Sequence, residues 1–127
     1  MRTARTWVWV DGEEVVAYFS LSGHAVKRSD VPRKVGRGSP EWIPTVLIAR
    51  LALDKRLHGQ GLGAELLIGS WRRIIEASEL VALRIVVVDA IDDSAVMFYE
   101  HFGFDVIPGT RRLVRRVSDI ASDLADD

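Results

Sequence analysis

Three glycines at alternate positions, Gly59, Gly61 and Gly63, separate an apolar run from a long amphipathic segment. Glycine has no Cβ, so a backbone that contains it can turn tightly and let a ligand approach closely. A helix that follows such a turn directs its first free N–H groups, and the positive end of its dipole, towards the turn. That arrangement favours an anion, most often a phosphate. Any fold for this chain therefore has to accommodate a strand, a glycine turn and a helix in succession.

The segments around the glycines predict a parallel β-α-β unit. The run from Val46 to Leu53 is typical of a buried strand, and residues 62–80 are typical of an amphipathic helix. The run from Ala82 to Val88 is almost continuously apolar, as in a strand buried on both faces. The apolar stripe of the helix consists of Leu62, Leu66, Leu67, Trp71, Ile74 and Ile75.

Antiparallel pairs are expected on either side of this unit. Thr6–Val10 and Glu14–Leu21 are rich in β-forming residues and are joined by Asp11-Gly12, a strong hairpin signal. Residues 27–44 contain three prolines and no sustained periodicity, which predicts a long, mostly irregular loop with at most a short turn of helix.

The C-terminal third predicts a short helix followed by two strands. Residues 92–94 offer helix caps, and residues 95–102 form a short helix that Gly103 closes. Phe104–Val106 and Arg111–Val117 are expected to be strands on either side of a turn, and Ser118 could cap a last short helix. The chain is therefore expected to be one α+β domain, residues 1–127, with a mixed sheet of about six strands and helices packed on it.

Composition excludes several classes of site. With 127 residues the chain is large enough for one domain with its own core. It has no cysteine, which excludes disulfides, thiolate ligands and a cysteine nucleophile and fits a cytosolic setting. Its three histidines lack the spacing of metal ligands, so no metal is expected. No apolar run reaches the ~20 residues that span a bilayer, so no membrane role is expected.

The net charge of −1 hides a segregation of charge. Acidic residues gather near the C-terminus, whereas basic residues form two clusters on either side of the central unit. Ordinary solvated faces remain an alternative for either cluster alone. The clusters are Lys27, Arg28, Arg33, Lys34 and Arg37, and Arg111, Arg112, Arg115 and Arg116.

The glycine turn also fits a loose dinucleotide fingerprint. Gly59-x-Gly61-x-x-Ala64 follows a strand, and Asp89 ends the next strand, where a ribose-binding acid could lie. The opening hairpin, the short chain and the five residues between strand and glycines argue against that fold. No Gly-Lys-Ser/Thr follows, which excludes a nucleotide-triphosphate P-loop. A purely structural turn remains an alternative.

Two blocks together resemble the GNAT family of N-acetyltransferases. Residues 56–64, RLHGQGLGA, look like the family's Q/R-x-x-G-x-G/A pyrophosphate loop, with His58 at its first position. Residues 95–104, AVMFYEHFGF, look like its A-x-x-F-Y-x-x-x-G-F block. The resemblance runs from about Thr6 to Val117. It implies a GNAT domain that lacks the strand and helices that normally precede the first hairpin.

A narrower resemblance points to one subgroup. Residues 44–54, PTVLIARLALD, look like the P-x-x-x-L-x-R-L-A-V-D strand of the GNAT toxins of bacterial toxin–antitoxin pairs. Those enzymes acetylate the free amine of aminoacyl-tRNA and halt translation, and their antitoxins are ribbon-helix-helix proteins. The resemblance therefore implies a cytoplasmic, translation-blocking toxin of a type II pair, with homodimer formation left open.

The resemblance also implies an acetyl-CoA site. The diphosphate would lie on the N–H groups of the glycine loop, and the pantetheine arm would run along the preceding strand, where a backbone N–H could stabilise an oxyanion. The cofactor-binding residues would be Leu51, Ala52, Leu53, His58, Gly59, Gln60, Gly61, Leu62, Gly63, Ala64 and Phe98.

Tyr99 is the candidate catalytic residue, because it matches the family's tyrosine. A free thiol has a pKa of about 8.5, so an acid near the leaving thiolate would speed its departure. The alternative is that Tyr99 only packs beside Phe98. The acceptor amine would attack the thioester directly, in agreement with the absence of cysteine. None of the three histidines is assigned a role as a base.

An aminoacyl-tRNA acceptor would give the basic residues a role in contacting phosphates, without choosing a base sequence. Arg50 is either near the acceptor or structural, and no aromatic stacking platform is evident. A GNAT enzyme for a small amine or a protein N-terminus, and a non-catalytic GNAT domain, remain alternative functions. The predicted nucleic-acid contacts are Arg33, Lys34, Arg37, Arg50, Arg72, Arg73, Arg111 and Arg112.

Overall fold

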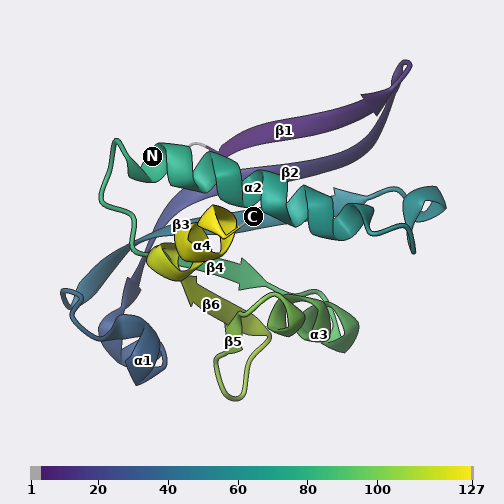
Figure 1. The fold of residues 1–127 in the computed structure, drawn as a ribbon. Coiled ribbons are helices and arrows are strands. Elements are labelled where there is room, and N and C mark those ends of the chain that lie inside the picture. The colour runs from purple at the N-terminus through teal and green to yellow at the C-terminus, as the bar shows by residue number, and fades with distance from the viewer. Residues whose placement is uncertain (1–3, 127) are drawn as a thin grey trace.

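The computed structural model describes residues 4–126, and these form one mixed six-stranded sheet with helices on both faces (Figure 1). The strand order is β1-β2-β3-β4-β6-β5. The strands are β1 (Ala4–Asp11), β2 (Glu14–Lys27), β3 (Trp42–Leu53), β4 (Ile85–Asp89), β5 (Asp105–Val106) and β6 (Arg112–Arg116). The helices are α1 (Arg33–Gly36), α2 (Leu62–Ser78), α3 (Asp93–His101) and α4 (Val117–Ala125), with 3-10 turns η1 (Arg28–Asp30) and η2 (Lys55–Leu57).

The predicted fold class is confirmed. β3 and β4 are parallel and are joined through α2, whereas all other neighbouring strands are antiparallel. The hairpin turn lies where Asp11-Gly12 predicts it, with Gly12 in the left-handed region at φ 64°.

The sheet separates two apolar layers. On one face α2 and α4 cover residues such as Phe19, Ile48 and Val88 (Figure 1). On the other face Val31, which follows η1, and Val35 of α1 contribute to a smaller cluster around Ile43 and Val87. Successive residues of β4 point into the two layers in turn, which explains its continuous apolar sequence. Within residues 4–126 no helix is long and apolar enough to cross a membrane.

The predicted long loop is shorter than expected, because the flanking strands extend into it. β2 continues to Lys27 and β3 begins at Trp42, so Pro44 lies inside a strand. A proline is tolerated in a strand at a position where no neighbouring carbonyl would need its missing N–H as a donor. Here β4 begins only opposite Thr45, and the carbonyl of Pro44 accepts the N–H of Arg84 at 3.0 Å.

Three other boundaries differ from the prediction. α2 ends at Ser78, and β4 starts at Ile85 instead of Ala82, because the intervening Leu80 and Val81 form an exposed turn. Ser118 does not cap the last helix, which begins one residue earlier. The backbone N–H of Val117 instead donates to the carbonyl of Arg84 at 2.9 Å, which fixes the start of α4 against the sheet.

α3 has a well-defined cap at each end. The side chain of Asp92 accepts the N–H of Ala95 at 2.8 Å. At the other end Gly103, with φ 87°, allows the N–H of Phe104 to reach the carbonyl of Tyr99 at 3.1 Å. A Cβ on Gly103 would lie 2.8 Å from the Nε of Arg115, whose side chain is held over the ring of Trp71.

Gly103→Ala is therefore expected to destabilise the fold by at least about 2 kcal/mol, because it adds a clash to the strain of a left-handed residue. Gly109→Ala is the matched control, since Gly109 has φ 79° and nothing within 4 Å of its Cβ position. The free energy of unfolding of the control should fall by only about 1 kcal/mol, which is the cost of the left-handed backbone strain alone. Denaturant unfolding measures both, and equal losses would contradict the role given to Arg115.

Candidate active site

A cleft opens where the two central parallel strands separate. The ladder between β3 and β4 ends at Ile48 and Val88, although β3 continues to Leu53. The cleft has a volume of about 710 Å³ and is lined by the end of β3, the glycine loop and α3. The carboxyl ends of parallel strands are a common ligand site in such sheets.

A bulge in β3 produces the separation. Ser20 of β2 pairs with Arg50 and Leu21 pairs with Ile48, so Ala49 has no partner across the ladder. An extra residue of this kind bends its strand and increases the local twist. The bend comes at the last residue that pairs with β4, so the remainder of β3 stays with β2 and leaves β4.

The main chain of β3 beyond the bulge faces the cleft on one side. The N–H of Asp54 donates to the carbonyl of Val16 on β2 at 2.7 Å. Because main-chain groups alternate in direction along a strand, those of Leu53 and Leu51 point away from β2. Within the described residues the β4 ladder does not reach them, and both residues line the cleft. Apart from the Leu53 carbonyl, which the His58 side chain contacts, they offer the hydrogen-bonding edge of an incomplete strand.

The N-terminus of α2 faces the same cleft. Gly61 adopts φ 75° as the residue before the helix, and the first helical hydrogen bond runs from Glu65 N–H to the Gly61 carbonyl at 3.3 Å. The N–H groups of residues 62–64 therefore have no partner within the helix. Gly59, with φ 80°, makes the other sharp turn of the loop. Free N–H groups at the start of a 17-residue helix favour an anion.

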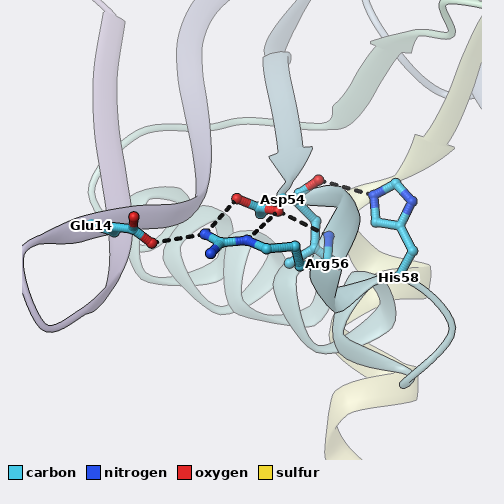
Figure 2. A network of polar contacts seen from close by, with 5 residues as sticks. Glu14, Asp54, Arg56 and His58 are labelled. Carbon is cyan, nitrogen blue, oxygen red and sulfur yellow. Dashed lines mark hydrogen bonds and ion pairs between the residues drawn. The ribbon is translucent and has the colours of Figure 1, made fainter.

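A polar network holds the loop in place (Figure 2). The side-chain Nε2 of His58 lies 2.9 Å from the carbonyl oxygen of Leu53, so the loop is tied to the end of β3. The guanidinium of Arg56 lies between Asp54, at 3.0 Å, and Glu14 at the hairpin tip, at 2.8 Å. Hydrogen bonds from Arg56 lower the pKa of Asp54, and the two carboxylates raise the pKa of Arg56. The network is exposed, so its role is to order the loop more than to stabilise the fold.

Tyr99 lies on α3 and lines the cleft with only 7% of its surface exposed. Its ring packs edge-on against Phe98 at 5.3 Å and Phe104 at 5.7 Å. Burial raises its pKa to about 12, since desolvation disfavours tyrosinate. Tyr99 therefore carries its proton at neutral pH and can donate a hydrogen bond into the cleft.

Phe98 connects the two helices that border the cleft. A Cβ on Gly63 would lie 3.7 Å from the Phe98 ring, which is ordinary van der Waals contact, so the ring lies beside the start of α2. Phe98 also packs on Phe102 at 5.1 Å. Gly59 and Gly61 therefore serve the turn through their left-handed backbone, whereas the space around Gly63 would admit a small side chain.

The structure brings most of the predicted cofactor residues together. Gln60 and Leu62 belong to the loop but do not line the cleft. Sequence reasoning missed Tyr18 and Ser94, and considered Asp89 only for a different ligand. Neighbouring side chains of a strand point to opposite faces of the sheet. The sequence of β2 could therefore have predicted that Tyr18 lies on the face opposite Phe19. The predicted residues that line the cleft are Leu51, Ala52, Leu53, His58, Gly59, Gly61, Gly63, Ala64, Phe98 and Tyr99.

The predicted nucleic-acid residues do not form one patch. Arg33 and Lys34 lie on α1, which contacts β6, and Arg37 directly follows that helix; none of the three lines the cleft. Arg72 and Arg73 lie on α2, whereas Arg50 lines the cleft. Several pair with acids: Lys34 with Asp105, Arg73 with Glu76, Arg111 with Asp93 and Arg112 with Asp89. Arg33, Arg37, Arg50 and Arg72 make no ion pair within the described residues.

Comparison with known proteins gives a consistent result. Residues 36–120 match the family model described as an acetyltransferase (GNAT) domain. A tRNA-acetylating toxin of Mycobacterium tuberculosis is 35% identical over 105 residues, which are 83% of this chain and 63% of the toxin. The chain thus spans less than two thirds of that relative.

Two solved structures share the fold over nearly the whole chain. AtaT complexed with acetyl-methionyl-tRNAfMet has a TM-score of 0.84 at 26% identity, covering 95% of this chain and 75% of AtaT. A tyrosine-to-phenylalanine mutant of AtaT, bound to the C-terminus of the antitoxin AtaR and to acetyl-CoA, has a TM-score of 0.79 at 26% identity. That match covers 96% of this chain and 72% of the mutant toxin.

The burial of Tyr99 predicts a titration that can be measured. Subtracting the tyrosinate absorbance of the Tyr99→Phe variant from that of the parent should isolate a step near pH 12. Because the folded-state pKa is raised, the associated stability is present below about pH 10, the ordinary tyrosine value, and is lost as the pH rises towards 12. Circular dichroism at each pH shows whether the chain is still folded. A step at the ordinary value in folded protein would contradict the burial.

Proposed function

This chain belongs to the GNAT acetyltransferases, and from that premise we propose that it transfers an acetyl group from acetyl-CoA to a primary amine. One observation carries the proposal: three features converge on one cleft. They are the open main-chain edge at Leu51 and Leu53, the free N–H groups at the start of α2, and the buried hydroxyl-bearing Tyr99.

The donor site follows from the chemistry of these groups. The N–H groups of residues 62–64 suit the diphosphate of coenzyme A. The open edge at Leu51 suits the amides of the pantetheine arm, which can hydrogen-bond to it as an additional strand would. The AtaT complex that contains acetyl-CoA supports this choice of donor for a related fold.

The reaction is a direct transfer. The amine nitrogen attacks the thioester carbonyl, a C–N bond forms, the C–S bond breaks, and the amine loses a proton to solvent. A main-chain N–H of Leu51 or Leu53 stabilises the oxyanion that forms during attack. The Tyr99 hydroxyl donates its hydrogen bond to the departing sulfur.

The pKa of Tyr99 decides the form of this assistance. A value of about 12 lies above the ~8.5 of a free thiol, so complete transfer of the tyrosine proton to a solvated thiolate is unfavourable. Desolvation in the cleft raises the thiol pKa as well, which narrows the gap. Tyr99 therefore acts as a hydrogen-bond donor that remains protonated across the physiological range, and the sulfur receives its proton finally from solvent.

For the acceptor we favour the aminoacyl group of charged tRNA. The relatives named for tRNA acetylation support this choice, as do the four predicted contact residues that make no ion pair within the described residues. In this proposal the protein is the toxin of a type II pair acting in the cytoplasm. Its antitoxin is a ribbon-helix-helix protein, and the toxin itself can form a homodimer. Acetylation of a small amine or protein N-terminus is the second candidate, supported by the exposed, uneven distribution of the basic residues.

Tyr99→Phe is expected to lower kcat on the order of 100-fold, because the departing sulfur loses its donor. The affinity for acetyl-CoA, measured by isothermal titration, should change less than about twofold, since none of the binding groups is removed. Unchanged turnover with intact binding would refute the role of Tyr99. A parent chain that binds no acetyl-CoA would leave only a non-catalytic GNAT domain.

Acetylation of charged tRNA predicts a specific effect on translation. Adding the protein with acetyl-CoA to a cell-free translation reaction should inhibit synthesis, because an N-acetylated aminoacyl-tRNA lacks the free amine needed for peptide-bond formation. Peptidyl-tRNA hydrolase should relieve the inhibition by removing the blocked aminoacyl group, and omitting acetyl-CoA is the control. Full translation alongside measurable acetylation of free amines would favour the second candidate.

A further inference from the structure

Three arginines line a hollow of about 360 Å³ at the end of the sheet opposite the cleft. Arg37 follows α1, Arg84 precedes β4, and Arg116 ends β6 at the start of α4. The ladder between β3 and β4 begins at Ile85, beside the hollow, and ends at Val88, which lines the cleft. Figure 1 shows α1 and α3 near these two opposite ends. The hollow is therefore a separate site.

The charge of this hollow is not balanced by the residues that line it. No carboxylate lines it within the described residues, and Arg37 makes no ion pair there. Arg116 contacts Asp119 at 3.3 Å, but Asp119 lines a neighbouring hollow. Val35 and Val117, both buried, form an apolar part of the wall. A recess with one sign of charge and an apolar wall focuses its field, so this hollow attracts an anion.

The guanidinium of Arg84 is held in position by the protein itself. Its Nε donates to the hydroxyl oxygen of Ser39 at 3.0 Å, and its Nη2 donates along the same edge to the carbonyl of Gly38 at 3.4 Å. The main-chain carbonyl of Arg84 accepts the N–H of Val117 at 2.9 Å. The edge formed by the two terminal nitrogens remains for a bidentate contact with an oxyanion.

Two further donors lie in the same hollow. Ser39 is the most deeply buried of the polar residues that line it, with 6% of its surface exposed. Its oxygen accepts from Arg84, and no hydrogen bond within residues 4–126 uses its own proton. A buried hydroxyl proton normally has an acceptor, so that of Ser39 suits a ligand oxygen. The main-chain N–H of Ser118, in the first turn of α4, adds to these side chains.

Charge and depth together select the kind of anion. A phosphate monoester carries a charge of about −1.5 to −2 at pH 7 and has three free oxygens, enough for several guanidinium groups. It can enter the hollow end-on and reach Ser39 while its one substituent stays outside. A phosphodiester has a smaller charge and a substituent on either side of the phosphorus, so it cannot enter as deeply. The hollow therefore suits a terminal phosphate better than the backbone of a nucleic acid.

We propose that the hollow between Arg37, Arg84 and Arg116 binds the phosphate group of a small phosphate monoester, with Ser39 donating to one of its oxygens. Of these arginines, only Arg37 is among the predicted nucleic-acid contacts. The inference does not depend on the proposed transfer reaction, because the N-terminus of α2 lies at the cleft and takes no part in this hollow.

An NMR titration of the folded chain tests the site and its preference. Methyl phosphate is the probe, and it should shift the main-chain amide of Ser118 and the Nε–H of Arg84 until the site is saturated. Dimethyl phosphate is the matched diester, and it should bind on the order of tenfold more weakly, because it has lost charge and a free oxygen. Saturable shifts confined to residues 59–64, or equal binding of the two probes, would overturn the proposal.

Two variants of neighbouring arginines test the residues. Arg37→Gln should weaken the binding of methyl phosphate on the order of tenfold, because a charged donor is lost. Arg33→Gln is the matched control: Arg33 is exposed, lies on α1 and makes no ion pair within the described residues, but it does not line the hollow. The control should change the affinity less than about twofold.

The amide spectrum of each variant shows whether it is folded. Equal losses of affinity in Arg37→Gln and Arg33→Gln would indicate a general attraction of charge and would overturn the site. Folded Arg37→Gln with the affinity of the parent chain would do the same.

Discussion

The bulge at Ala49 is the constraint on which the site depends. Buried main-chain groups in a sheet need partners, and a parallel strand ordinarily supplies them along its full length. Here the ladder to β4 stops at Ile48, so the end of β3 keeps β2 on one side and gives the other side to the cleft. Without the bulge, β3 and β4 could continue together and the cleft would be closed by main-chain hydrogen bonds. The sheet thus provides a binding edge because the end of β3 has no main-chain partner on the side of the cleft.

Two helices, α2 and α3, complete the candidate site at this edge. α2 begins beside the end of β3 because His58 and the Arg56 network hold the short loop between them. α3 brings Tyr99 to the opposite wall, and its closing glycine positions Phe104 against the tyrosine ring. Phe98 lies beside Gly63, so the two helices meet at the cleft. The groups proposed to contact the anion, the amides and the leaving group are therefore brought to one cleft by ordinary packing.

Much of this could be predicted from local patterns. The hairpin, the parallel unit, the glycine turn and the caps of α3 follow from alternation, helical periodicity and turn residues, which act over a few positions. The bulge could not be predicted from local patterns, because Ala49 is an ordinary strand residue and its unpaired state depends on the register between β3 and β2. Pro44 was misinterpreted for a related reason: its effect depends on where β4 begins. The basic residues were predicted by charge alone, and only the fold shows that Arg112 is held by Asp89 at 2.7 Å.

The end of β3 is a strand edge without a main-chain partner on the side of the cleft, and its surroundings decide what it can bind. The edge is short, bent by its bulge and close to a helix N-terminus, so it suits a narrow ligand that carries amides and an anionic group. A polypeptide strand cannot enter it without meeting Tyr99 and Phe98. The hydrogen-bonding groups of this edge are therefore accessible to a narrow ligand and not to a further strand of the sheet.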